Sequence, residues 1–206
     1  MKIKGLYCIL PEFETLQEYI SFTRKLIKFN PDVIQLRIKN FSDKFFYSVA
    51  LNIKKILASK KIPFIIDDRV DIALLVKADG VHLGQDDLPA EVVRKLLKIK
   101  SKNFIIGVST HSFQQAKEAL KMPVDYISIG PVFPTSTKDY KPVGLQTVKE
   151  VVLLAKNKMP VVAIGGINSK NVELLKEIKP SAIAVISALK IADLKREVFK
   201  LKSIFK

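Results

Sequence analysis

Hydrophobic residues gather in eight short runs, at 3–10, 33–38, 63–67, 80–84, 103–109, 125–132, 160–166 and 182–187. Most of the runs are nearly continuous, which is typical of strands buried on both faces of a parallel sheet. Between them lie eight segments with the apolar spacing of amphipathic helices, at 14–29, 41–59, 69–77, 89–99, 112–121, 145–157, 169–178 and 189–204. This alternation predicts one α/β domain over residues 1–206, a single (β/α)8 TIM barrel.

Polar and glycine-bearing signatures follow several of the predicted strands. They are Gln35 to Lys39, Asp67-Asp68, His82 to Asp87, Gly107 to Ser109, Thr135 to Lys138 and Gly165-Gly166. In a parallel barrel the carboxyl ends of all strands face one mouth, so residues far apart in the sequence can meet there. We therefore expect the functional site at this mouth.

Three polar side chains alternate at the end of the second predicted strand. Gln35, Arg37 and Lys39 are two residues apart, which places them on the same face of a strand. Such a stripe inside a barrel is costly unless charged ligands or partners compensate for it. The alternative is an exposed face at a frayed strand end.

Carboxylates follow two neighbouring strands. Asp67 and Asp68 end the third strand, and Asp86 and Asp87 follow the fourth. Oxygen ligands of this kind suit Mg²⁺, and carboxylates from adjacent strands can share one ion. The alternatives are structural: Asp87 as a helix cap ahead of Pro89, and Asp68 as a partner of Arg69 or a cap.

The last two strands end in groups that suit a phosphate. Gly165-Gly166 and Ile186-Ser187 lie where barrels often bind phosphate through backbone amides. A double glycine can equally serve a tight turn. The loop from Pro134 to Lys138 adds hydroxyl donors and a cation, although such loops often merely turn.

Composition restricts the class of protein. A 206-residue chain with 48% hydrophobic residues can bury a sizeable core, and no apolar run approaches the roughly 20 residues of a membrane span. The first residues lack the features of a signal peptide, so we expect a cytoplasmic protein. The net charge of +15 is compatible with a polyanionic partner, but the lysines are spread over nearly every predicted helix without interleaved aromatic residues. This favours a solvated surface and no nucleic-acid or membrane partner.

Taken together, these signatures resemble the thiamine-phosphate synthase family, which includes thiazole tautomerases. The resemblance runs almost end to end and is best at 79–87, 107–111, 130–138 and 160–167. It implies condensation of hydroxymethylpyrimidine diphosphate with hydroxyethylthiazole phosphate, giving thiamine phosphate and diphosphate. In this dissociative reaction diphosphate leaves first and the thiazole nitrogen attacks the resulting cation, so the protein mainly stabilises charge and positions substrates.

The resemblance also implies a role for each matching residue. Asp68 and Asp87 would bind Mg²⁺, and a catalytic diphosphate clamp would comprise Arg37, Lys39, Ser109 and Lys138. Gln35 and His82 would contact the pyrimidine, and Thr135 and Thr137 would line the thiazole or diphosphate region. The thiazole phosphate would lie against Gly165, Gly166, Ile186 and Ser187. The family further suggests a homodimer.

One departure from the family pattern concerns the substrate-binding position 67. The family commonly has asparagine before the metal-binding aspartate, whereas this chain has Asp67. If Asp67 points into the site, it should weaken diphosphate binding unless it is protonated or paired with a cation. Ile38 also replaces a usual acidic residue, and Ile9 to Pro11 replaces a segment that usually ends in a polar residue.

Two other functions fit parts of the pattern. A thiazole tautomerase would use His111 as its general acid and base and would need no metal. The retained Asp68, Asp87 and Thr-Ser-Thr-Lys loop favour the synthase, because a tautomerase has no need of a metal-diphosphate site. A non-catalytic phosphate-binding barrel would instead show salt-sensitive polyanion binding without turnover.

Overall fold

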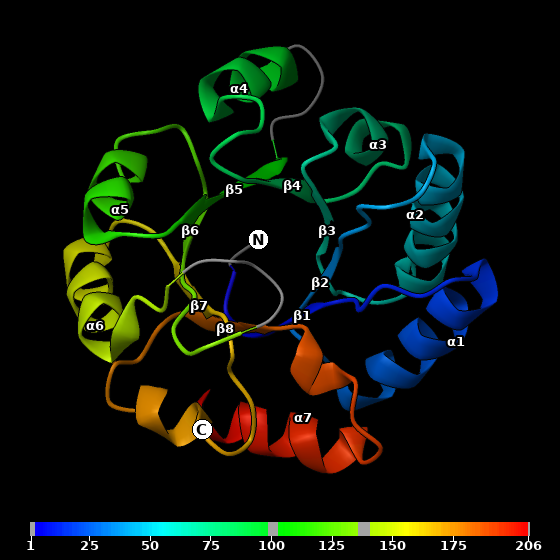
Figure 1. The fold of residues 1–206 in the computed structure, drawn as a ribbon. Coiled ribbons are helices and arrows are strands. Elements are labelled where there is room, and N and C mark those ends of the chain that lie inside the picture. The colour runs from blue at the N-terminus through cyan, green and yellow to red at the C-terminus, as the bar shows by residue number, and fades with distance from the viewer. Residues whose placement is uncertain (1–2, 99–102, 136–140, 206) are drawn as a thin grey trace.

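The computed structural model describes residues 3–98, 103–135 and 141–205. Eight parallel strands pair in chain order and close into a barrel, with helices forming an outer ring (Figure 1). The strands are β1 (Gly5–Ile9), β2 (Val33–Leu36), β3 (Phe64–Asp67), β4 (Gly80–Leu83), β5 (Ile105–Thr110), β6 (Tyr126–Ile129), β7 (Val161–Ile164) and β8 (Ala182–Val185). The predicted (β/α)8 barrel is therefore confirmed, with each strand somewhat shorter than its apolar run.

The α-helices follow the predicted order with shorter bounds. They are α1 (Leu16–Leu26), α2 (Asp43–Leu57), α3 (Val70–Leu75), α4 (Ala90–Lys98), α5 (Phe113–Ala119), α6 (Gly144–Ala155) and α7 (Leu194–Lys202). Short 3-10 turns add η1 (Ile27–Phe29), η2 (Val172–Leu175), η3 (Ser187–Leu189) and η4 (Ser203–Phe205). No helix among the described residues could cross a membrane.

Two predicted helices were wrong in kind or extent. Segment 169–178 contains only the 3-10 turn η2, because the Asn168 and Asn171 side chains bond to the backbone of the preceding loop and Lys179 turns into the left-handed region just before Pro180. Segment 189–204 divides, since η3 ends at Leu189 and α7 begins only after Asp193, whose carboxylate accepts from the Arg196 N–H at 3.0 Å.

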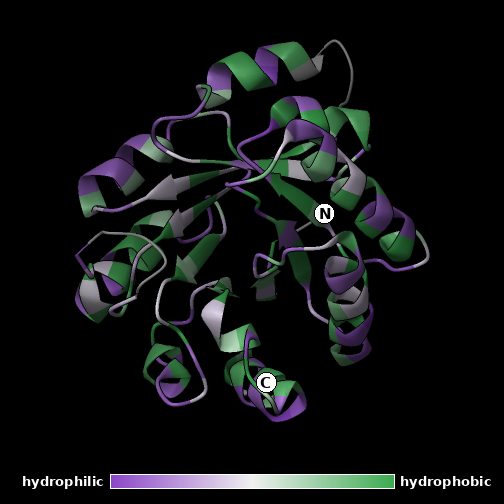
Figure 2. Ribbon diagram, turned by 45° about the vertical axis from the view of Figure 1, so that its right-hand side comes forward, coloured by the Kyte–Doolittle hydropathy of each residue, from purple (hydrophilic) through white to green (hydrophobic). Residues whose placement is uncertain are grey.

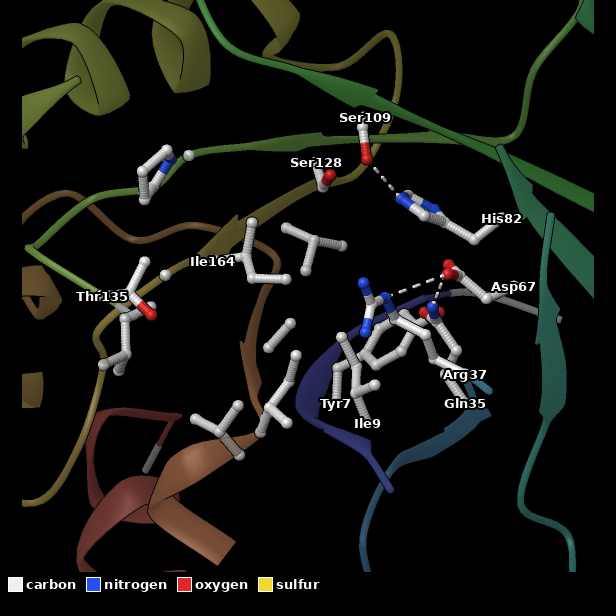
Figure 3. A pocket seen from close by; sticks show the side chains of 18 of the residues that line it. Tyr7, Ile9, Gln35, Arg37, Asp67, His82, Ser109, Ser128, Thr135 and Ile164 are labelled. Carbon is white, nitrogen blue, oxygen red and sulfur yellow. Dashed lines mark hydrogen bonds and ion pairs between the residues drawn. The ribbon is translucent and has the colours of Figure 1, made fainter. Parts of the chain in front are cut away.

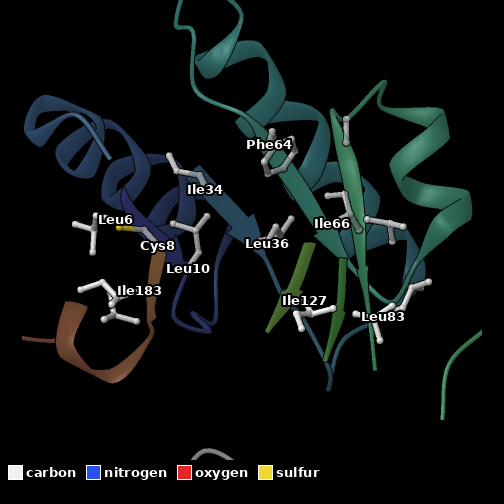
Figure 4. Packing of buried hydrophobic residues seen from close by; sticks show 14 of the residues in the cluster. Leu6, Cys8, Leu10, Ile34, Leu36, Phe64, Ile66, Leu83, Ile127 and Ile183 are labelled. Carbon is white, nitrogen blue, oxygen red and sulfur yellow. The ribbon is translucent and has the colours of Figure 1, made fainter. Parts of the chain in front are cut away.

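The hydrophobic core has two layers, because side chains alternate along each strand. Outward-facing residues such as Leu6, Cys8, Ile34 and Leu36 pack beneath the helices (Figure 4). Inward-facing residues such as Tyr7 and Ile65 fill the barrel. Figure 2 shows largely hydrophobic strands, whereas the helices are mixed in hydropathy, as expected of elements with one solvated face.

Candidate active site

A pocket opens at the carboxyl ends of the strands, where the polar signatures were expected. Every strand contributes to its lining, from Ile9 on β1 to Ala184 on β8. Its wall combines apolar side chains, among them Val162 and Ile164, with charged and hydroxyl groups. Figure 3 shows Gln35, Arg37 and Asp67 on one side of this pocket and Thr135 on the other.

The Gln35, Arg37 and Lys39 stripe converges on two aspartates. The Gln35 amide donates to Asp67 Oδ1 at 2.6 Å, and Arg37 Nε lies 3.4 Å from Asp67 Oδ2. Lys39 Nζ donates to Asp68 and lies 4.0 Å from Asp67 Oδ2. Gln35 and Arg37 line the pocket, whereas Lys39 lies at its rim as an exposed side chain. The three side chains therefore form one charged wall, which excludes the frayed-end alternative.

Asp67 points into the pocket and is paired with a cation. It is 8% exposed, lines the pocket and contacts Arg37 and Lys39. The sequence left open whether this extra carboxylate would be compensated. In the structure the charge of Asp67 is compensated, but the ion pair that compensates it uses Arg37, a cation expected to clamp the diphosphate.

Asp68 and Asp87 lie beside one another at the ends of β3 and β4. Burial raises the pKa of Asp68, and the neighbouring Asp87 carboxyl raises that pKa further, against the lowering effect of Lys39. Asp87 Oδ2 also accepts from the Gly84 N–H at 2.6 Å. Both structural alternatives for Asp68 are wrong, since Arg69 pairs with Asp43 and Asp71 instead, and the N-cap position of α3 is Arg69, without a side-chain cap. For Asp87 the bond to Gly84 stabilises a turn rather than a helix start.

This donor set fits a Mg²⁺ ion. Asp68 and Asp87 offer hard oxygen ligands, and their mutual repulsion is the kind that a bound cation relieves. Within the residues that the structure describes, no group of three or more His, Cys, Asp or Glu side chains could hold a metal. A pair of carboxylates nevertheless suffices for Mg²⁺, which usually takes its remaining ligands from water and substrate phosphates.

An interior hydrogen-bond network crosses the floor of the pocket. His82 Nε2 lies 2.9 Å from Ser109 Oγ, and His82 Nδ1 lies 2.9 Å from the Tyr126 hydroxyl. The Tyr126 and Tyr7 hydroxyls are 2.8 Å apart, and Tyr7 donates to Gln35 Oε1 at 2.6 Å. The network thus places three predicted site residues, Gln35, His82 and Ser109, in one connected set.

Tyr7 and Tyr126 are pocket residues that the sequence reasoning missed. Each is a hydroxyl-bearing residue within an apolar strand, in the same inward phase as Ile9 and Ser128. That phase was the available signal, since an inward tyrosine hydroxyl in a barrel needs a polar partner. Burial raises the pKa of both phenols, so they keep their protons.

The opposite wall contains the residues that were expected to bind the thiazole phosphate. Gly165, Gly166, Ile186 and Ser187 all line the pocket. The two glycines have φ values of 100° and 66°, and a side chain at either would collide with the loop after β6. The backbone conformation and the close packing therefore require glycine at both positions, which also line the pocket. Thr135 lines the pocket too, whereas Thr137 and Lys138 lie outside the described residues.

His111 also reaches this pocket from the end of β5. Its Nδ1 lies 2.7 Å from the carbonyl oxygen of Gly130, which can only accept, so this nitrogen is the donor. The backbone N–H of His111 donates to Gln115 Oε1. Ser112 caps α5 by accepting from the Gln115 N–H at 3.1 Å.

Comparison with known proteins connects this geometry with a family. The family model described as thiamine monophosphate synthase matches residues 6–189. The chain belongs to this family. Thiamine-phosphate synthase from Persephonella marina is 45% identical over 190 residues, covering 91% of this chain and 88% of the relative. The enzyme of that name from Clostridium tetani is 47% identical over 160 residues, covering 76% and 73%.

A solved structure from the thiamine-phosphate synthase family has the same architecture. Thiamine phosphate pyrophosphorylase from Pyrococcus furiosus superimposes with a TM-score of 0.85 at 36% identity, covering 97% of this chain and 94% of that one. The family resemblance noted from the sequence is thereby confirmed.

Proposed function

We propose that this protein is a thiamine-phosphate synthase, a transferase that joins hydroxymethylpyrimidine diphosphate to hydroxyethylthiazole phosphate. The observation that supports it best is the convergence of Arg37, Lys39 and the Asp68–Asp87 pair at the rim of a partly apolar pocket. A neutral heterocycle suits the apolar interior, and a diphosphate suits the charged rim.

The proposed clamp would stabilise the leaving diphosphate. Arg37 and Lys39, which follow β2, would face its oxygens, with Ser109 of β5 beside them. The family resemblance assigns Lys138 to the same clamp. Mg²⁺, held by Asp68 and Asp87, would supply further neutralisation of the diphosphate charge. Because charge develops on the leaving group as its bond to the pyrimidine breaks, fixed cations at this rim would lower the barrier.

The pocket interior would orient the two heterocycles. Gln35 and His82 would contact the pyrimidine, and His82 already stacks on Tyr126 with ring centroids 5.4 Å apart. Thr135 and Thr137 would line the thiazole or diphosphate region, and Gly165, Gly166, Ile186 and Ser187 would hold the thiazole phosphate. This arrangement would bring the thiazole nitrogen to the carbon that loses diphosphate, which is catalysis by positioning.

The decisive test compares Asp87→Ala with Asp86→Ala. Asp86 is the exposed neighbour of Asp87 and serves as the matched control. In the presence of Mg²⁺ we expect Asp87→Ala to lower kcat/KM for thiamine phosphate formation by about 100-fold or more, because the clamp loses a metal ligand. Asp86→Ala should stay within about threefold of wild type.

Folding must be measured beside turnover. Both variants should melt within a few degrees of wild type, so that a loss of rate reports on the site. Equal rates in folded Asp87→Ala and wild type would contradict the proposed site. Metal-independent isomerisation of a thiazole carboxylate phosphate without thiamine phosphate would favour the tautomerase.

A cytoplasmic location and a homodimeric state are further proposals supported by the family resemblance. Light scattering on the purified protein tests the second of these.

A further inference from the structure

The interior network has a direction that chemistry can assign. Its six members form an unbroken series of hydrogen bonds across the barrel, in the order Asp67, Gln35, Tyr7, Tyr126, His82 and Ser109. Every heavy-atom separation in the series is between 2.6 and 2.9 Å. A phenol has one proton to donate, so the choice made at one end restricts every bond that follows.

The Asp67 carboxylate fixes the direction of the first bond. A carboxylate can only accept, so Gln35 must present its NH₂ group to Asp67 and its carbonyl oxygen to Tyr7. Tyr7 then donates its only hydroxyl hydrogen to Gln35 Oε1. Tyr126 must consequently donate to the Tyr7 oxygen, since Tyr7 has no proton left for that bond.

The donor and acceptor roles of His82 and Ser109 follow from that of Tyr126. Because Tyr126 donates its hydroxyl hydrogen to the Tyr7 oxygen, Tyr126 can only accept a hydrogen bond from His82. His82 must therefore have its hydrogen on Nδ1. A neutral imidazole then has its lone pair on Nε2, and Ser109 must donate to it. Both phenols keep their protons in this network, because burial raises their pKa values.

We propose that Asp67 is a positioning residue that sets the polarity of the interior network, holding His82 as the Nδ1–H tautomer and the Ser109 hydroxyl as a donor to His82. In this state Ser109 has no proton to offer toward the pocket and presents only acceptor lone pairs there. A residue at the end of β3 thereby determines the hydrogen-bonding character of a residue on β5.

Asparagine at position 67 should reverse the network. The Arg37 guanidinium forms an ion pair with Asp67 Oδ2, with Nε 3.4 Å from that oxygen, so an amide at this position would turn its oxygen toward Arg37 and its NH₂ group toward Gln35. Gln35 would turn its carbonyl to that NH₂ group and donate to Tyr7. Each later bond would then reverse, leaving His82 with its hydrogen on Nε2 and Ser109 free to donate into the pocket.

The consequence for ligand binding rests on the proposed function. Ser109 is expected to face the diphosphate, whose oxygens accept hydrogen bonds. In the wild-type polarity the Ser109 hydroxyl presents only lone pairs to these oxygens, and this weakens diphosphate binding. The negative charge of Asp67 weakens it further. Asp67→Asn should therefore strengthen binding through two effects, loss of a negative charge and a new donor at Ser109.

The primary test is the tautomer of His82, read from its ¹⁵N chemical shifts at pH 8 in the full-length protein. The sequence has two histidines, so His111→Asn assigns the signals. We expect the Nδ1–H form in wild type and the Nε2–H form in Asp67→Asn. An Nε2–H or doubly protonated ring in wild type, or the same tautomer in both proteins, would overturn the proposal.

Tyr126→Phe provides the control for transmission, because it deletes one hydroxyl of the network and preserves the ring. In this background Asp67→Asn should no longer change the His82 tautomer. If Tyr126→Phe does not fold, Tyr7→Phe breaks the network one bond nearer to Asp67. A tautomer switch that persists in the broken network would contradict transmission along it.

Calorimetric titration with inorganic diphosphate and Mg²⁺ tests the consequence. Asp67→Asn should tighten binding about tenfold or more in the wild-type background. The gain should be smaller with Tyr126→Phe, where only the charge effect remains. Equal gains would refute the role of Ser109. A tautomer switch without diphosphate binding in any variant would support the polarity and contradict the proposed function.

Discussion

At the scale of single residues, Asp68 combines an unfavourable backbone conformation with an unfavourable buried charge. It adopts a left-handed backbone conformation with φ of 57°, which is uncommon outside glycine, asparagine and aspartate. Its pKa is raised mainly by burial, so the charged form is disfavoured by folding. Stability therefore falls as the pH rises from the ordinary value of 3.8 through the raised pKa, and the loss persists above it.

Asp68→Asn should separate stability from metal binding. Removing the charge relieves its burial and its repulsion by Asp87, and asparagine tolerates the backbone conformation. We expect its unfolding free energy at pH 7 without metal to be no more than about 0.5 kcal/mol below that of wild type. Magnesium should raise the melting temperature of wild type but not of the variant. A variant clearly less stable without metal would show that the Lys39 ion pair outweighs the repulsion.

At the scale of elements, a repeated device ties the strands together at the end opposite the pocket. The residue just before each even-numbered strand accepts a hydrogen bond from a backbone N–H of the preceding strand. The bonds are Asp32 to Leu6 at 2.9 Å, Asp79 to Phe64 at 2.9 Å, Asp125 to Ile106 at 2.7 Å and Ser181 to Val161 at 3.2 Å. A helix cation also pairs with each aspartate, from Lys202, Lys54 and Arg94 respectively. The device couples β-strand pairs to the helix ring.

Asp125→Ala should therefore destabilise the barrel without altering chemistry. It leaves the fully buried Ile106 N–H without this acceptor, and an unsatisfied buried donor costs about 1–3 kcal/mol. Chemical denaturation should show this loss, whereas kcat should stay within about twofold of wild type because the site lies at the other end of the strands.

Asp71→Ala is the matched control for this prediction. Asp71 pairs with Arg69 on the surface and is 57% exposed, so its loss should cost at most about 1 kcal/mol. Equal destabilisation by the two variants would show that the bond to the strand contributes nothing beyond a surface ion pair.

At the scale of the whole molecule, the pocket exists only when the barrel closes. Each strand contributes lining residues, and β1 pairs with β8 to complete the ring. Ligands that bind across this mouth contact elements from both halves of the chain. Their binding free energy must therefore add to the stability of the folded barrel by mass action.

Diphosphate with Mg²⁺ should raise the melting temperature of the whole protein. At a ligand concentration about 100 times Kd the gain is about 2.7 kcal/mol. For a chain of this length that corresponds to roughly 5–10 °C. Differential scanning calorimetry measures the shift, with Asp87→Ala as the control that should lose most of it. An equal shift in that variant would place the bound anion elsewhere.

Local patterns in the sequence were sufficient for much of the fold. The near-continuous apolar runs predicted every strand, because burial on both faces demands hydrophobic residues at successive positions. The segment at 169–178 was wrong because side-chain bonds from Asn168 and Asn171 compete with helix formation, and apolar spacing does not reveal them.

The sequence by itself determined the eight-stranded barrel and, through its resemblance, the family and most of the residues at the mouth, such as Gln35 and Gly166. Tertiary structure alone decided how these residues are engaged. It paired Arg37 with Asp67 and joined Tyr7 and Tyr126 to His82. The reason is physical: strand patterns depend on neighbours in the sequence, whereas hydrogen-bond direction depends on atoms brought together across the barrel from 27 to 119 positions away.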